Sequence, residues 1–143
     1  MDKRYFDKFQ TRILKALLKA DELVGKCEMG ESTAIMVDNG CAVLIPNNVL
    51  VLDISGMRDV PIEIVFEKSE TDCPIRTTGN IRDEAIGDIV EMVTSDGEII
   101  WVKRDYVRMF DGYTMIYNSS CNALRVEDKS GQPIGAFNPV KMS

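Results

Sequence analysis

The chain has 143 residues, of which 45% are hydrophobic and 28% charged, as is ordinary for one globular domain with a sizeable core. No apolar run approaches the ~18–20 residues that cross a bilayer, and the polar N-terminus lacks the apolar stretch of a signal peptide, so we expect no membrane span and a cytoplasmic location. The chain lacks histidine and its four cysteines form no C-x-x-C pair. These features exclude histidine-dependent nucleophiles and leave no zinc spacing motif, so we expect no catalytic residue, no metal site and no cofactor.

The predicted elements begin with an amphipathic helix over residues 4–20, where apolar side chains recur at helical spacing. Asn39-Gly40 and Asp96-Gly97 each lie between β-rich runs and predict two hairpins. The polar segment 68–87 shows no periodicity and predicts a long loop. A short second helix is expected at 103–110, and strands are expected at 33–37, 41–45, 49–54, 62–67, 89–94, 98–102, 114–118, 123–127 and 132–141.

The order of these elements predicts an α+β fold, with two amphipathic helices packed on antiparallel β-sheet meanders. A helix followed by strands occurs twice, so the chain reads as two α-β-β-β halves. The expected organisation is a single domain over 1–143, in which halves 1–67 and 88–143 are joined by the loop 68–87.

The charge is unevenly distributed along the chain. The net charge is −6, yet residues 1–20 hold six basic and only two acidic side chains. Five of the bases recur every three or four residues and would form one stripe along the first helix, which two arginines of the second helix could extend. Such a stripe fits contacts with DNA phosphates, although a solvated helix face carries similar charge. The predicted DNA-binding residues are Arg4, Lys8, Arg12, Lys15, Lys19, Arg104 and Arg108.

Two stretches carry a resemblance to a known family. Ile100-Trp101-Val102-Lys103 leads into the second helix, and the closing stretch 123–140 places two strands around Lys129-Ser130-Gly131 before Pro139-Val140. This arrangement resembles one domain of a bacterial-type DNA sliding clamp, or of a phage or mobile-element relative. The resemblance implies helices that face double-stranded DNA. Clamp chains carry several such domains, so a ring of this chain would need a homo-oligomer of about six copies.

These observations favour a non-enzymatic, DNA-associated binding protein with a clamp-like domain. The alternative is a phage-type inhibitor, such as an anti-CRISPR or other anti-defence protein, that binds a host nuclease through its acidic surface. In either case the protein partner would be a nuclease or a replication factor. A third interpretation, an enzyme that uses carboxylates and Mg²⁺ on nucleotides, also stays open. The acidic residues expected to bind a protein are Glu63, Glu67, Glu70, Asp72, Asp83, Glu84 and Asp88.

Overall fold

The computed structural model describes residues 7–8, 10–11, 25–38 and 40–141. From residue 25 onward, the described chain is mostly β-structure with one short helix and one 3-10 turn. Its elements are β1 (Gly25–Met29), β2 (Ser32–Asp38), β3 (Cys41–Pro46), β4 (Arg58–Asp59), η1 (Glu63–Phe66), β5 (Asp72–Glu84), β6 (Gly87–Thr94), β7 (Ile99–Lys103), α2 (Arg104–Met109), β8 (Thr114–Asn118), β9 (Ala123–Glu127) and β10 (Pro133–Phe137).

The predicted α+β fold, with two amphipathic helices on antiparallel meanders, is therefore wrong. The helix α2 has only six residues, and β1 pairs with β4 in parallel, so the strand arrangement is mixed. The helix predicted at 4–20, which would open the first α-β-β-β half, lies mostly outside the described residues. Strands predominate in residues 25–38 and 40–141 because β-branched and aromatic side chains pack well on a pleated sheet.

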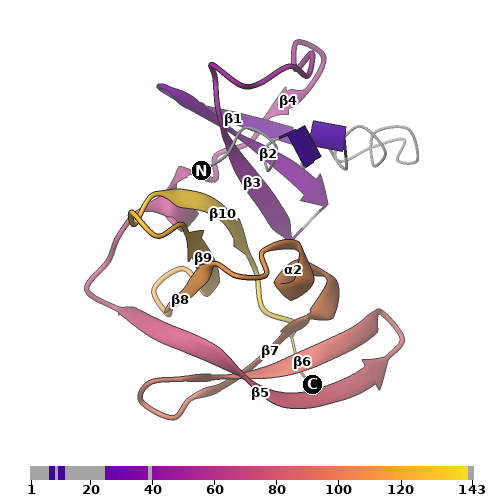
Figure 1. Cartoon of the computed structure of the whole chain (residues 1–143), viewed down its shortest axis with the longest axis vertical. Coiled ribbons are helices and arrows are strands. Elements are labelled where there is room, and N and C mark those ends of the chain that lie inside the picture. Colours follow the sequence, from indigo (N-terminus) through magenta and orange to yellow (C-terminus); the bar gives the residue numbers. More distant parts are fainter. Residues whose placement is uncertain (1–6, 9, 12–24, 39, 142–143) are drawn as a thin grey trace. The chain divides into compact units, whose positions relative to one another are not determined.

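The chain divides into two compact units, residues 1–64 and 65–143 (Figure 1). In the first unit, the strand order is β4-β1-β2-β3. The pairs β1–β2 and β2–β3 are antiparallel, which confirms the hairpin predicted at Asn39-Gly40. The first five residues of β3 are all buried, so this strand forms the centre of the unit's core.

The segment after β3 was predicted to be a strand at 49–54, and this prediction is wrong. The buried side chain of Gln10 supplies the hydrogen bonds that a neighbouring strand would have made. Its Nε2 donates to the carbonyl of Val49 at 2.8 Å, and its Oε1 accepts the backbone N–H groups of Val51 and Leu52 at 2.6 and 3.1 Å. The side chain of Gln10 thereby satisfies the hydrogen-bonding groups of an irregular backbone segment. The strand expected at 62–67 is likewise replaced, here by the 3-10 turn η1.

In the second unit, the strand order is β10-β9-β8-β5-β6-β7. All five residues of β9 are buried, because this strand lies between β8 and β10 and is covered on both faces. The strands expected at 114–118 and 123–127 are confirmed with the same bounds. Strand β10 ends at Phe137, two residues before Pro139, which has no N–H for a sheet ladder.

The core of the second unit gathers around α2. The ring of Phe137 lies 5.7 Å from that of Tyr106 and stacks on Phe110 at 6.0 Å between centroids. The buried side chains of Met92 and Val102 come from the core-facing side of β6 and β7. These contacts hold the short helix to the sheet, since six residues alone make too short a helix to be stable in water.

None of the helices in the described residues could span a membrane, because none is long and apolar enough.

Candidate functional site

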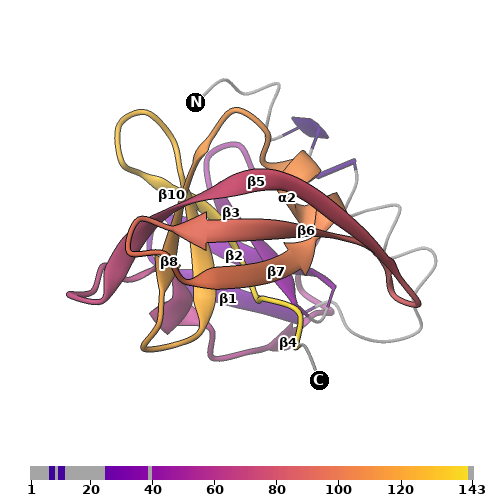
Figure 2. The same cartoon turned by 90° about the horizontal axis from the view of Figure 1, so that it is seen from below.

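The most exposed ordered part of the second unit is the hairpin of β5 and β6, residues 72–94, which we call the hairpin arm (Figures 1 and 2). Every residue from 76 to 88 is exposed. The sequence predicted a polar loop at 68–87, yet β5 runs through 13 of these residues. Hydrogen bonding to β6 supplies this order, because a strand with few apolar residues carries no periodic pattern of its own.

A wide irregularity interrupts the arm. Three residues of β5, Thr78 to Asn80, lie opposite the single residue Glu91 of β6. The Glu91 carboxylate accepts hydrogen bonds from the Thr78 hydroxyl at 2.8 Å and the Asn80 amide at 3.0 Å. Gly79, between them, has φ +94°, which side chains other than glycine rarely adopt. The bulge is thus a fixed feature with its own side-chain contacts.

The end of the arm combines apolar and acidic side chains. Ile81 and Ile86 are 51% and 55% exposed, although neither side chain has a polar atom that can hydrogen-bond to water. Three carboxylates, Asp83, Glu84 and Asp88, lie on the same short stretch. Asp88 pairs with Arg104 at 3.3 Å, so most of the negative charge belongs to Asp83 and Glu84.

The outer face of the sheet β5–β6–β7 carries an aromatic contact. The Arg82 guanidinium lies 4.7 Å from the ring centroid of Trp101, within the range of cation–π attraction. Ile99 on the same face of β7 is 49% exposed. The three strands lie side by side in the foreground of Figure 2. This face therefore offers an arginine–tryptophan pair and an exposed apolar side chain, the residue types that proteins use in contacts.

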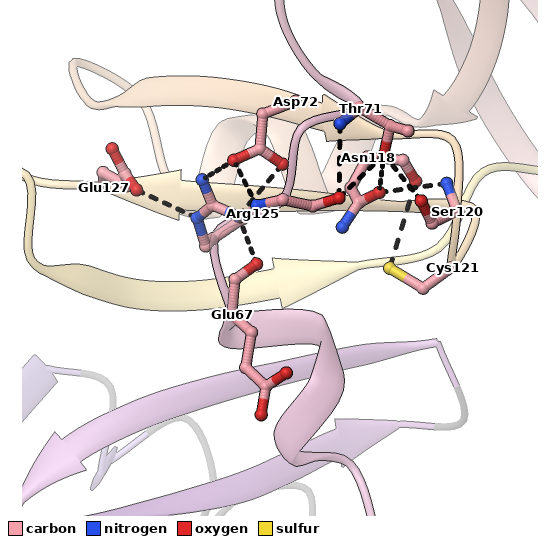
Figure 3. A network of polar contacts seen from close by, with 9 residues as sticks. Glu67, Thr71, Asp72, Asn118, Ser120, Cys121, Arg125 and Glu127 are labelled. Carbon is pink, nitrogen blue, oxygen red and sulfur yellow. Dashed lines mark hydrogen bonds and ion pairs between the residues drawn. The ribbon is translucent and has the colours of Figure 1, made fainter.

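A buried ion cluster holds the base of the arm (Figure 3). Arg125 of β9 is 1% exposed and donates to Asp72, the first residue of β5, at 2.8 Å. Its Nε donates to Glu127 at 2.9 Å, and its Nη1 donates to the carbonyl of Glu67 at 2.8 Å. One guanidinium therefore joins β9, β5 and the segment that precedes β5. Because these hydrogen bonds use the Arg125 guanidinium, Arg125 holds the strands in place and does not bind a ligand.

The ionisation of this cluster follows from its contacts. Burial alone would raise the pKa of Asp72, but the hydrogen bonds from Arg125 and from the Ser69 N–H outweigh burial and lower this pKa. For Arg125, burial opposes the charged form, while the bonds to Asp72 and Glu127 outweigh it and raise the pKa. Both partners therefore stay charged at neutral pH.

A second set of polar contacts adjoins the cluster (Figure 3). The Thr71 hydroxyl donates to Asn118 Oδ1 at 2.5 Å and lies 2.7 Å from the Ser120 hydroxyl. Asn118 Oδ1 also accepts the Ser120 N–H at 2.9 Å. These bonds tie the residue before β5 to the β8–β9 turn. The arm is thus fixed at its base and exposed along the rest of its length.

The predicted DNA-binding residues are only partly described. Lys8 is exposed, Arg104 pairs with Asp88, and Arg108 is exposed in the last turn of α2. The remaining four lie outside the described residues: Arg4, Arg12, Lys15 and Lys19.

The predicted protein-binding acids fall into separate places. Glu63 belongs to the first unit, whereas Glu67 and Glu70 are exposed before β5. Asp72 is neutralised at the base of the arm, and the last three lie at its end: Asp83, Glu84 and Asp88. Within residues 25–38 and 40–141, no group of three or more acidic or thiol side chains is placed to hold a metal ion.

Sequence reasoning missed two contacts that shape the site, the Arg125 cluster and the Arg82–Trp101 pair. The signal for the first was an arginine between Leu124 and Val126 in a strand, a place where burial requires partners. Its partner Asp72 is 53 positions away in sequence.

Comparison with known proteins finds no matching family model, no matching curated protein and no matching solved structure. The sliding-clamp resemblance therefore stays a prediction, while the fold expected from it is wrong.

Proposed function

We propose that this protein is a non-enzymatic binding protein that contacts a partner protein through the hairpin arm. The observation that carries this proposal is the exposure of every residue from 76 to 88 in an ordered hairpin. Ordering exposed backbone costs about 1–2 kcal/mol per residue in conformational entropy. Interaction surfaces that are ordered before binding avoid this cost at the time of association.

The side chains at the end of the arm indicate the kind of partner. Ile81 and Ile86 would supply apolar contact area, and Asp83 with Glu84 would supply negative charge around it. An apolar centre with a charged rim is the usual composition of a protein interface. The complementary surface is basic with an apolar contact point, as in nuclease channels that otherwise hold nucleic acid. An inhibitor that occupies such a channel is the function that these residues support best.

The base of the arm suits this function. Arg125, Asp72 and Glu127 fix the first residue of β5 relative to β9. The Glu91 contacts keep the bulge in one conformation. A rigid arm delivers its end to a partner without a search among conformations, which favours affinity.

The test is quantitative capture from a host lysate with two arm variants. The first is the double substitution Ile81→Ser and Ile86→Ser, and the second is Asp83→Asn with Glu84→Gln. The matched control is Ile64→Ser, because Ile64 is 58% exposed but lies in the first unit. We expect a basic protein that wild type and the control retain, and that both arm variants lose.

Salt and DNA provide independent measurements. The retained protein should be released by about 0.5 M salt, where the Debye length falls to ~4 Å. Equal retention by wild type and both arm variants would refute the proposal. Duplex DNA binding, measured by fluorescence anisotropy, that disappears with Arg104→Glu and Arg108→Glu but not with the arm variants would instead support the DNA-associated function.

A further inference from the structure

A cavity of about 420 Å³ opens at the base of the hairpin arm. Its walls come from Pro74 and Ile75 of β5, from Val93 of β6, and from the turn after β6. Cavities of roughly 300–1,000 Å³ are typical of sites for small molecules. This cavity lies away from the acidic end of the arm, so it needs an explanation separate from the protein contact.

The cavity has one charged lining residue, Arg76. Arg76 is exposed, and within the part of the chain that the structure describes it forms no ion pair. Arg76 of β5 pairs with Val93 of β6, and Val93 pairs in turn with Ile99 of β7. Neither of these cross-strand neighbours is a carboxylate. The nearby Glu91 carboxylate is already bound by Thr78 and Asn80.

Several other polar groups of the walls have partners. The Ser95 N–H donates to the carbonyl of Pro74 at 2.9 Å, and the Gly97 N–H donates to the carbonyl of Thr94 at 3.0 Å. The Ser95 hydroxyl lies 3.0 Å from the Cys73 thiol. The guanidinium is the one charged group among the lining residues that can donate hydrogen bonds to a ligand in this cavity.

We propose that the cavity binds a small carboxylic acid, with the carboxylate on Arg76 and an apolar body against Pro74 and Val93. The planar guanidinium pairs with a carboxylate through two parallel hydrogen bonds. A single positive charge matches a monoanion, whereas a phosphate dianion would be left with uncompensated charge. The same chemistry is offered by a free organic acid and by the C-terminus of a peptide with an apolar last residue.

The turn that lines the cavity carries an acidic side chain, which gives a second test. Asp96 lies in the turn between the wall residues Ser95 and Gly97. Its carboxylate accepts a hydrogen bond from the Thr94 hydroxyl, and this bond lowers its pKa, so Asp96 is ionised at neutral pH. Substitution Asp96→Asn should therefore tighten the binding of a carboxylate.

The experiment is an NMR titration of the full chain with phenylacetate, with phenylacetamide as the uncharged control. We expect amide shifts at the cavity walls with phenylacetate, and binding at least about tenfold weaker with phenylacetamide or with Arg76→Gln. Arg82→Gln is the matched arginine control and should leave the affinity unchanged. Acetyl-Gly-Phe, which ends in a free carboxylate, tests the peptide source against the free acid.

Each outcome decides the proposal. Shifts at the walls that depend on Arg76 and increase with Asp96→Asn support it, and the better of the two probes identifies the source. An absence of shifts with both probes, equal binding of the amide, or unchanged binding by Arg76→Gln overturns it. The spectrum of the free variant shows directly that it is folded, as expected for substitution of an exposed side chain.

Discussion

Replacing Arg125 with methionine should strongly destabilise the second unit. The substitution removes four hydrogen bonds and leaves Asp72 and Glu127 as neighbouring carboxylates whose side chains are only 19% and 9% exposed. Breaking a buried ion pair by removing one partner costs about 3–5 kcal/mol. This is a large part of the ~5–15 kcal/mol that stabilises a typical domain, and it corresponds to a fall in Tm of about 10–20 °C.

The assay is urea unfolding followed by the fluorescence of Trp101. The chain has one tryptophan, and it lies in the second unit, so the signal reports on that unit. The matched control is Arg108→Met, because Arg108 is exposed and its loss should change stability by no more than about 0.5 kcal/mol. A loss below about 1 kcal/mol for Arg125→Met would refute the argument that the cluster holds the base of the arm.

Two further predictions concern other contacts. Replacing Gln10 with alanine should cost about 1–3 kcal/mol and speed hydrogen exchange at the Val51 and Leu52 amides, while Thr11→Ala, at an exposed position, should leave both unchanged. The lowered pKa of Asp72 gives stability that is fully present above the ordinary aspartate value and is lost as the pH falls through the lowered value. The urea midpoints of wild type and Asp72→Asn should therefore differ at pH 7 and converge below about pH 4; a constant difference would contradict this assignment.

The second half of the chain was predictable from sequence because its strands bury alternating or continuous apolar residues between clear turn signals. Strands β8 and β9 were predicted residue for residue, and α2 to within one residue at each end. The first half was harder. Strand β1 begins at Gly25 and contains no apolar run, and the strand expected at 49–54 is replaced by backbone bonds to Gln10, which is 39 residues from Val49 in sequence.

The candidate site was least predictable where the conformation of a segment depends on other strands that pair with it. Strand β5 has no regular alternation of apolar and polar residues. Its conformation depends on pairing with β6 and on the contact between Asp72 and Arg125. The acids Asp83, Glu84 and Asp88 were predicted to bind a protein from their closeness in sequence, and this role stays a prediction. That they lie at the end of an ordered hairpin, rather than in a loop, required the structure.

The bulge opposite Glu91 has a consequence for the behaviour of the chain in concentrated solution. Within the described residues, β5 pairs with β8 only at Asp72–Pro74, so the outer edge of β5 beyond Pro74 presents unpaired backbone groups. Long, regular edges of this kind template the addition of further strands and lead to aggregation. The residues Thr78 to Asn80 break the repeat of that edge midway. The arm can therefore remain exposed for a specific partner without offering a continuous ladder to unrelated chains.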